Sequence, residues 1–389
     1  MQSNFTLCAI SLFGLEAITA EELRKLGFEN VRTETGRVLF SSDFAGIARA
    51  NLALRTAERV LVHLGEFPAR SFTELFDGVT ALPWENWITR EAIFPVKGYA
   101  LKSTLFSVPD CQAIIKKAIV ERLKKHYHLS WLPESGPKYQ IQFSILKDTA
   151  ALYIDTSGAG LHKRGYRPQS VEAPLKETLA AAMVHLSRYQ GREYLCDPCC
   201  GSGTILIEAA MIASGRWPGI SRRFASEAWP QLDQATWTQL RGQAKKQEKP
   251  PLALPICGYD IDPEAVKLSQ ENASRAGVGR HIKVETGDVA KLKIAHHDVI
   301  ITNPPYGERM LDLEQARRLI ECLGSLMKNY HNPLYVISPE EKFETYFGQK
   351  ADKKRKLYNG MIRCNLYMYY EKKSGIIREI IRPEKEELQ

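Results

Sequence analysis

Short apolar strands alternate with amphipathic helices through residues 175–306. The helix APLKETLAAAMVHLSRYQG is followed by EYLCDP and TILIEAAMIA, by PICGYDID and PEAVKLSQENASRAG, by IKVETGD, and by DVIITNPPY. Parallel strands need long crossover connections, which are usually helices, so this alternation predicts βαβ units. It therefore predicts an α/β, Rossmann-like, doubly wound parallel sheet, which residues 214–250 interrupt as an insertion.

Two smaller α+β units are predicted ahead of this sheet. Residues 4–67 alternate between strand-like segments such as NFTLCAI and RVLVHLGEF and helical ones such as GLEAITAEELRKLGF. In the next unit, Ser107 is a suitable cap for the helix VPDCQAIIKKAIVERLKKHY. The strands KYQIQFSIL and AALYIDTS form a hairpin that turns through Lys147 and Asp148. The basic, glycine-containing segment at 160–170 reads as a junction between domains.

Composition excludes several classes of protein. The 389 residues include no apolar stretch approaching the roughly 18–20 residues of a membrane span. The N-terminus lacks a basic signal-peptide region, and the eight scattered cysteines suit reduced thiols, so a cytoplasmic protein is expected. Cys196, Cys199 and Cys200 lack a second Cys/His pair at zinc-like spacing, so no metal site is expected. A net charge of +8 favours a polyanionic partner.

The segment DPCCGSGT, residues 197–204, joins a predicted strand to a predicted helix. Gly201 and Gly203 allow a tight turn and close approach of a ligand at the carboxyl end of a strand, where open α/β sheets bind ligands. Asp197 disfavours a pyrophosphate and suits a ligand with an ammonium group. Leu206 replaces the third glycine of the dinucleotide fingerprint, and no phosphate-binding G-x-x-x-x-G-K-[ST] loop occurs, so a dehydrogenase or an NTPase is disfavoured.

Two further acidic residues are predicted at strand ends. Asp260 can accept hydrogen bonds from both hydroxyls of a ribose, and Ile261 is free to pack against an adenine ring. Asp262 precedes Pro263 and is expected to cap the next helix. Asp288 could accept from an exocyclic adenine amine, although a turn-forming Gly-Asp pair explains it equally well.

The fourth segment, NPPY, follows the strand VIIT. An exocyclic amine of a nucleobase is a poor nucleophile because its lone pair is delocalised into the ring. The Asn303 side-chain oxygen and the Pro304 carbonyl can accept its N–H bonds and favour a more tetrahedral nitrogen. Pro305 fixes the backbone, and Tyr306 offers a face for a base taken out of its helix. The pattern indicates catalysis by positioning and preorganised acceptors, without a metal or a covalent intermediate.

In this order the four segments resemble motifs I–IV of class I S-adenosylmethionine-dependent methyltransferases. NPPY is the form of motif IV found in the enzymes that methylate exocyclic amines of adenine, cytosine or guanine. The resemblance implies a seven-stranded catalytic domain with S-adenosylmethionine as cofactor. The implied catalytic residues are Asn303, Pro304, Pro305 and Tyr306. The implied cofactor-binding residues are Asp197, Cys199, Gly201, Gly203, Thr204, Asp260, Ile261 and Asp288.

Other segments resemble the bacterial THUMP-containing methyltransferases, which include N2-guanine enzymes of 23S rRNA and of tRNA. These segments are GLEAITAEELRKLG, RTAERVLVHLGEF, LHKRGYR before APLKETLAAAM, and KLYNGMIRCNLYMY. The resemblance implies a ferredoxin-like domain at 1–67, a THUMP domain at 68–165 and a methyltransferase domain at 166–380. The rRNA enzyme that modifies two sites has a second catalytic domain, whereas this chain has one, so only the N2-guanine activity is expected.

Residues 111–138 contain six Lys or Arg against two Glu. A basic helix is by itself most often a helix with a solvent-exposed charged face, but the resemblance to THUMP proteins favours RNA binding for this one. Lys353 to Lys356 suit either a phosphate contact or a solvated loop. The predicted RNA-contacting residues are Lys116, Lys117, Lys124, Lys125, Lys163, Arg164 and Arg167.

These patterns favour an RNA N2-guanine methyltransferase, with 23S rRNA preferred over tRNA. An N6-adenine DNA methyltransferase stays open because adenine N6 presents the same amine chemistry. The two basic α+β units argue against it, because they show no helix-turn-helix or other DNA target-recognition pattern. A third hypothesis is an RNA-binding assembly factor whose methyltransferase site is vestigial. The intact ligand-facing motifs argue against it.

Overall fold

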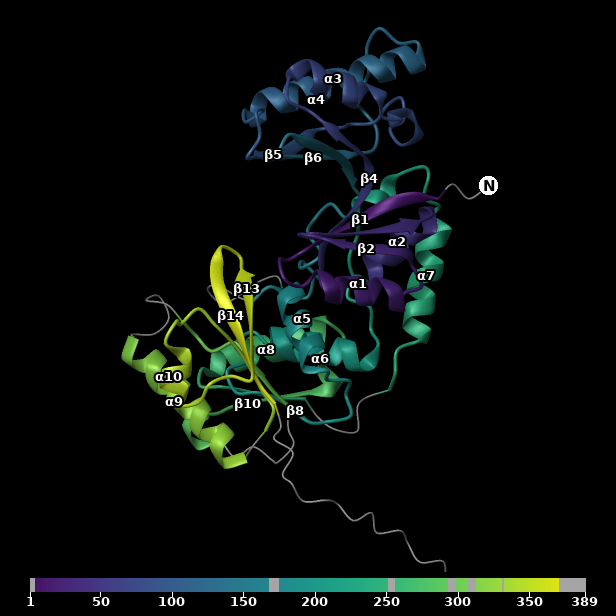
Figure 1. Ribbon diagram of the computed structural model, residues 1–389. Helices are drawn as coiled ribbons and strands as arrows, with labels where there is room; N and C mark the ends of the chain where they lie inside the picture. Colours follow the sequence, from purple (N-terminus) through teal and green to yellow (C-terminus); the bar gives the residue numbers. More distant parts are fainter. Residues whose placement is uncertain are drawn as a thin grey trace, which may run out of the picture.

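The computed structural model describes residues 4–167, 175–250, 256–292, 299–306, 313–330 and 332–370. Its strands form two seven-stranded sheets, one in each half of the chain (Figure 1). The first has the order β2-β3-β1-β4-β7-β6-β5, and the second has the order β10-β9-β8-β11-β12-β14-β13. The predicted fold class, a Rossmann-like domain behind two α+β units, is confirmed.

The first sheet is shared by the two N-terminal units. Strand β4 is 12 residues long; its first half pairs with β1 and its second half with β7, both antiparallel. One strand thus joins the predicted ferredoxin-like and THUMP domains, and the boundary proposed after residue 67 falls at its end. The elements of the first unit are β1 (Phe5–Ser11), α1 (Glu16–Lys25), β2 (Glu29–Glu34), β3 (Arg37–Ser42), α2 (Phe44–Ala53) and β4 (Ala57–Pro68).

In the second unit, α3 and α4 cover one face of the strands. The other face of β5 exposes Lys97, Tyr99 and Leu101, because alternate side chains of a strand point to opposite faces. Lys147 and Asp148 turn the predicted hairpin with φ of 50° and 61°, and helix α4 starts after Ser107, whose side chain makes no capping hydrogen bond. The elements are α3 (Phe72–Ala81), β5 (Val96–Leu101), α4 (Val108–Tyr127), β6 (Gln140–Leu146) and β7 (Thr149–Asp155).

The second sheet is parallel except for β14, which is antiparallel to both of its neighbours. The direction of its winding reverses at β8, and ligands of open α/β sheets bind at the carboxyl ends of strands at such a switch point. Its strands are β8 (Leu195–Asp197), β9 (Ile256–Asp260), β10 (Ile282–Thr286), β11 (Val299–Thr302), β12 (Leu334–Ser338), β13 (Lys353–Asn359) and β14 (Ile362–Tyr369). Its helices are α5 (Glu177–Ser187), α6 (Thr204–Ser214), α8 (Pro263–Arg275), α9 (Leu313–Tyr330) and α10 (Phe343–Phe347).

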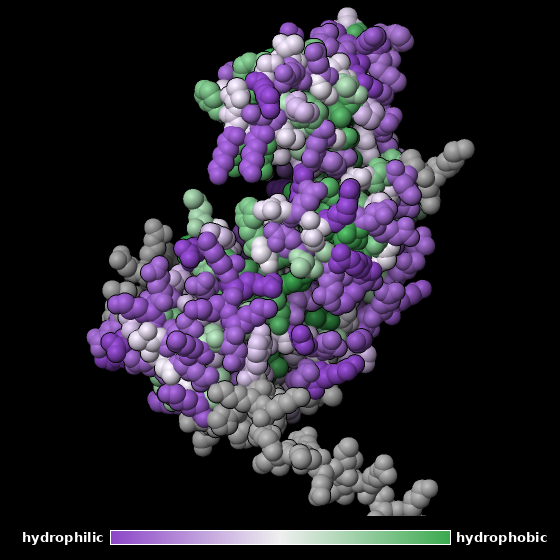
Figure 2. Space-filling model, viewed as in Figure 1, coloured by the Kyte–Doolittle hydropathy of each residue, from purple (hydrophilic) through white to green (hydrophobic). Residues whose placement is uncertain are grey.

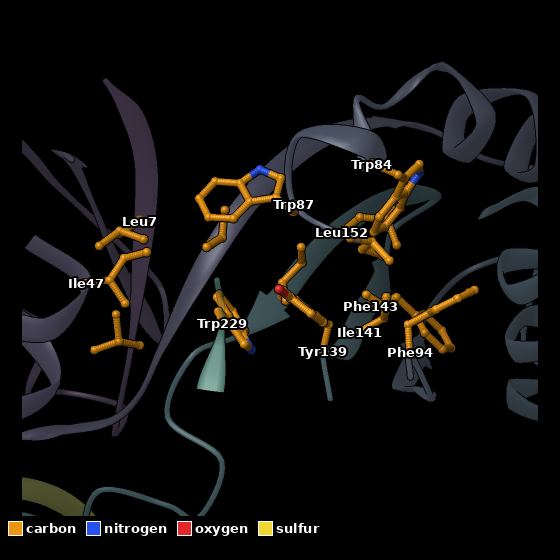
Figure 3. Close-up of a cluster of buried hydrophobic side chains, with 14 of the residues drawn as sticks. Leu7, Ile47, Trp84, Trp87, Phe94, Tyr139, Ile141, Phe143, Leu152 and Trp229 are labelled. Carbon is orange, nitrogen blue, oxygen red and sulfur yellow. The ribbon is translucent and has the colours of Figure 1, made fainter. Parts of the chain in front are cut away.

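The insertion at 214–250 packs on the N-terminal half of the molecule. It carries α7 (Gln234–Lys246), which lies beside α2 (Figure 1). The Trp229 ring stacks on Tyr139 with centroids 4.5 Å apart, and its indole N–H donates to the Lys138 carbonyl at 3.1 Å. Trp229 thereby joins the core formed by strands of the first sheet (Figure 3). The insertion therefore ties the catalytic half to the N-terminal half.

Candidate active site

The four predicted motifs lie at one edge of the second sheet. Asp197 ends β8 and Asp260 ends β9, whereas Asp288 follows β10 and Asn303 follows β11. These strands are neighbours in the order β10-β9-β8-β11, and they are parallel, so their carboxyl ends meet. Residues separated by more than 100 positions are therefore brought to one crevice.

Backbone amides of the glycine-rich loop bind the acidic end of β9. The Gly201 N–H donates to Asp260 Oδ2 at 2.8 Å, and the Asp262 N–H donates to Asp260 Oδ1 at 3.1 Å. Gly201 has φ of 53°, a conformation that side chains disfavour, while a Cβ at Gly203 would clash with Ser269 of α8. Each carboxylate oxygen retains a further lone pair, so Asp260 can still accept ligand hydroxyls.

Asp262 and Asp288 both act as helix caps. Asp262 Oδ1 accepts from the Glu264 N–H at 2.9 Å, which confirms the predicted cap of α8. Asp288 Oδ1 accepts from the Ala290 N–H at 3.0 Å and caps a short 3₁₀ turn. Asp288 also lines the cavity at this edge, so the turn role and a ligand role are compatible.

A cavity of about 380 Å³ opens between these motifs and α9. Its volume falls within the range of small-molecule sites, roughly 300–1,000 Å³. The predicted residues in its wall are Cys199, Asp260, Ile261, Asp288 and Pro305. Ile261 is 74% exposed although it is apolar, which suits an aromatic ring that covers it. Carboxylates beside an exposed isoleucine fit the adenosine part of S-adenosylmethionine.

The sequence analysis missed the whole wall that α9 contributes. Four of the lining residues, Gln315, Arg318, Leu319 and Cys322, come from this helix, at one-turn spacing along one side of it. The amphipathic pattern after NPPY was the available signal. That pattern identifies a helix, but it does not tell which of its faces meets a ligand.

Asp197 lies behind the cavity rather than in the described part of its wall. Its side chain is buried, and Oδ1 accepts from the Thr302 hydroxyl at 2.7 Å and from the Cys199 N–H at 3.1 Å. Burial raises the pKa of Asp197 to about 7, and the two hydrogen bonds oppose that rise only in part. Because Thr302 directly precedes Asn303, Asp197 connects the glycine-rich loop to the NPPY segment.

The raised pKa of Asp197 predicts how the stability of the ligand-free protein depends on pH. Between the unfolded value of 3.8 and about 7 the folded state holds a proton that the unfolded state releases, so stability falls as pH rises through this window. Asp197→Asn keeps an oxygen acceptor and removes the charge. We expect its thermal midpoint at pH 8 to exceed that of the wild type by at least about 3 °C, roughly 1 kcal/mol. Calorimetric scans from pH 5 to 8 measure this, and equal slopes for the two proteins would contradict it.

The NPPY segment presents an unsatisfied acceptor. Asn303 Oδ1 is buried and has no hydrogen-bond partner among the described residues. Pro304 is buried, and Pro305 lines the cavity. The Tyr306 hydroxyl accepts from Asn359 Nδ2 at 3.1 Å, and burial raises the pKa of Tyr306. An orphaned acceptor of this kind costs free energy unless a ligand donor satisfies it.

The predicted RNA-contacting lysines of α4 differ in their surroundings. Lys116 Nζ lies 2.7 Å from Glu134 Oε1 and 3.4 Å from the centre of the Phe94 ring, so its charge is compensated locally. Lys124 lies 3.9 Å from a glutamate of its own helix, whereas Lys117 and Lys125 are exposed. Lys163 is also exposed. These lysines stay candidates for phosphate contact, with Lys117 and Lys125 the most available.

Arg164 requires a correction. Its side chain is buried, with the guanidinium paired to Glu208 at 3.2 Å and donating to the Leu161 and Arg55 carbonyls. Arg167 also turns inward, where it binds Glu177 at 2.9 Å and Thr204 Oγ1 at 3.0 Å. Both arginines thus pair with buried carboxylates of α5 and α6, which require cationic partners. Arg164 also reaches the ferredoxin-like domain through the Arg55 carbonyl.

The described residues contain no group of three or more His, Cys, Asp or Glu side chains placed to hold a metal ion. None of the described helices is both long and apolar enough to cross a bilayer. Burial raises the pKa of the Cys199 and Cys200 thiols well above their usual value, so both are unreactive at neutral pH.

Three family models match the chain in succession. They describe an RlmL ferredoxin-like domain at residues 6–61, a THUMP domain at 69–155 and an RMKL-like methyltransferase domain at 164–368. YpsC of Bacillus subtilis (strain 168), named as a candidate RNA methyltransferase, is 41% identical over 373 residues, which cover 95% of this chain and 97% of YpsC.

Solved structures agree with these matches. A crystal structure titled a predicted N6-adenine-specific DNA methylase from Listeria monocytogenes is 44% identical, with a TM-score of 0.90 over 95% of this chain and 97% of that chain. SMU.472, a candidate methyltransferase solved with SAH, is 42% identical, with a TM-score of 0.90 over 96% of this chain and 100% of that chain. SAH is the demethylated product of S-adenosylmethionine, which is therefore the methyl donor. The chain belongs to the RMKL-like family of THUMP-containing, S-adenosylmethionine-dependent RNA methyltransferases.

Proposed function

We propose that this protein methylates the exocyclic N2 amine of a guanine in RNA, with 23S rRNA preferred over tRNA. The observation that carries the proposal is the buried Oδ1 of Asn303, which follows β11 and has no hydrogen-bond partner within the described part of the chain. A nucleobase amine is a donor that this acceptor suits. A target base in place would satisfy the oxygen.

The residues of the NPPY segment orient the target. Asn303 Oδ1 and the Pro304 carbonyl accept the two N–H bonds of the amine and direct the nitrogen lone pair away from the base plane. The ring of Tyr306, held through its hydroxyl by Asn359, supports the extracted base. Bound S-adenosylmethionine supplies the electrophilic methyl group. The gain in rate comes from preorganised acceptors that need no rearrangement during the reaction.

The cofactor would be held by the edge of the sheet that carries the acidic residues. Asp260 is suited to the ribose hydroxyls, Ile261 to the adenine ring and Asp288 to the adenine amine. All three line the same cavity. Asp260 is fixed for this role because two backbone amides hold its carboxylate.

The preference for guanine and for rRNA rests on the N-terminal half. Residues 6–61 match the ferredoxin-like domain of RlmL, and this type of domain accompanies the rRNA enzymes that the sequence resembles. The name of the Listeria protein supports adenine N6 in DNA instead, and NPPY alone suits both amines. A THUMP domain and the name of YpsC favour RNA over DNA.

Mapping the methylated product tests the proposal. The protein is incubated with S-adenosylmethionine and with 23S rRNA, tRNA or duplex DNA from cells that lack its gene. Mass spectrometry of the nucleosides is expected to find N2-methylguanosine, mainly in 23S rRNA. N6-methyladenosine, or methylation of DNA alone, would overturn the proposal. Failure to bind SAH in calorimetry would favour the assembly factor with a vestigial site.

A further inference from the structure

A second cavity, of about 570 Å³, lies between the ferredoxin-like domain and the methyltransferase domain. One wall is the loop between β1 and α1, with Leu12, Phe13 and Gly14. The other wall is β13 and its turn, with Lys356, Tyr358 and Gly360. Lys356 and Tyr358 are two positions apart and so lie on one face of the strand, and Gly360 stands in the turn that follows it. We call this cavity the Phe13 groove.

Phe13 is held as a rigid, open aromatic surface. Its side chain is 60% exposed although it is apolar. The ring rests on Gly36, where a Cβ would come within 3.3 Å of it. Glu16 accepts from the N–H groups of Gly14 and Gly36 at 2.9 Å each, which fixes the loop around the ring. A ring immobilised in this way loses little conformational entropy when a flat ligand covers it.

The opposite wall adds a second ring and a positive charge. Lys356 is exposed and forms no ion pair with a described residue, and its Nζ lies 5.9 Å from the centre of the Tyr358 ring. Arg355 Nη1 donates to the Gly14 carbonyl at 3.0 Å, so the two walls are joined directly. Two aromatic rings beside a free cation suit a nucleotide better than an apolar peptide segment.

The Phe13 groove and the catalytic segment meet the same strand, β13, from its two faces. Asn359, which donates to the Tyr306 hydroxyl at 3.1 Å, directly follows Tyr358 of the groove wall, and its side chain points to the opposite face. The β13–β14 hairpin projects toward the THUMP domain (Figure 1), and the space-filling view shows a recess between that domain and the methyltransferase domain (Figure 2). A strand of RNA that places one base at Tyr306 and passes over the β13–β14 hairpin would meet this groove.

We propose that the Phe13 groove binds a nucleotide adjacent to the target guanine in single-stranded RNA. Its base stacks on Phe13, and Lys356 contacts its phosphate. The inference rests on the proposed function in that it requires an RNA substrate. It assigns part of the substrate recognition to the ferredoxin-like domain, which contributes the ring.

Direct binding tests the groove. The probe is a fluorescein-labelled heptamer RNA with one central guanosine among uridines, and fluorescence anisotropy in the presence of SAH reports its affinity. Phe13→Ala is expected to weaken binding roughly 5- to 100-fold, the effect of losing one base–aromatic stack. Phe13→Trp is expected to retain affinity, and the fluorescence of the added tryptophan is expected to be quenched by the RNA. Lys356→Ala is expected to weaken binding and to reduce its dependence on salt.

Tyr194→Ala is the matched control. Tyr194 is 42% exposed and directly precedes β8, at the amino end of this central strand, whereas the site lies at the carboxyl ends. This variant should bind the heptamer like the wild type, and all variants should bind SAH with unchanged affinity in calorimetry. Unchanged heptamer affinity in Phe13→Ala, or no heptamer binding by the wild type, would contradict the proposal that the Phe13 groove binds a nucleotide.

The product of the reaction separates this inference from the proposed function. If the wild type forms N2-methylguanosine while Phe13→Ala binds RNA normally, the groove is wrong and the function stands. If RNA binding depends on Phe13 while the product is N6-methyladenosine, the groove stands and the choice of base is wrong. If the Phe13 groove binds another protein while RNA affinity does not depend on Phe13, the proposal that the groove binds a nucleotide is likewise wrong.

Discussion

Asn303→Ala is expected to lower the rate of methyl transfer by at least about 100-fold, the scale of losing one preorganised polar contact. The Asn303 oxygen is buried without a partner among the described residues, so its removal leaves no described donor without an acceptor. Folding, SAH affinity and RNA affinity are therefore expected to be close to those of the wild type. Single-turnover measurements with saturating RNA check the rate, and calorimetry checks the binding of SAH.

Two other variants sharpen this prediction. Asn303→Asp keeps an oxygen acceptor at the same position and is expected to retain more activity than Asn303→Ala. Asp260→Ala removes a residue that the glycine-rich loop binds, so it is expected to weaken SAH affinity instead. Retained turnover in Asn303→Ala would show that the catalytic centre lies elsewhere.

Arg164→Met is expected to destabilise the protein by about 3–5 kcal/mol, because it leaves the buried Glu208 carboxylate without its cationic partner. For a domain of this size the loss corresponds to a fall of roughly 6–20 °C in the unfolding midpoint. The change also removes a hydrogen bond to the Leu161 carbonyl within the junction and one to the Arg55 carbonyl, which joins the junction to the ferredoxin-like domain. Differential scanning calorimetry of the full chain measures the midpoint.

The neighbouring lysine supplies the control. Lys163 is exposed, so Lys163→Met is expected to change the stability by no more than about 0.5 kcal/mol. Combining Arg164→Met with Glu208→Leu should recover most of the loss, since the unpaired charge is then gone. A normal midpoint together with weakened RNA binding in Arg164→Met would restore Arg164 as an RNA-contacting residue.

The order of the four motifs, and their places at strand ends, can be predicted from local patterns of residues. Each motif is a local event, in which a strand of a few apolar residues ends in polar or glycine residues and a helix or turn begins. The cap by Asp262 and the hairpin turn at Lys147 and Asp148 are local in the same way and are confirmed. Parallel strands place such ends at one edge, so the crevice could be predicted without coordinates.

Which polar side chains remain available to a ligand depends on contacts between distant segments, and local patterns do not predict it. Arg164 reads as a surface cation in a basic junction, but contacts with Arg55 and Glu208, which lie 109 and 44 residues away, bury it. Asp197 is turned toward Thr302, and α9 and Phe13 are brought to their cavities from other parts of the chain. The burial and ion pairing of a side chain depend on segments that are distant in sequence. A local pattern predicts a helix or a strand, but it does not predict which face of that element the distant segments cover.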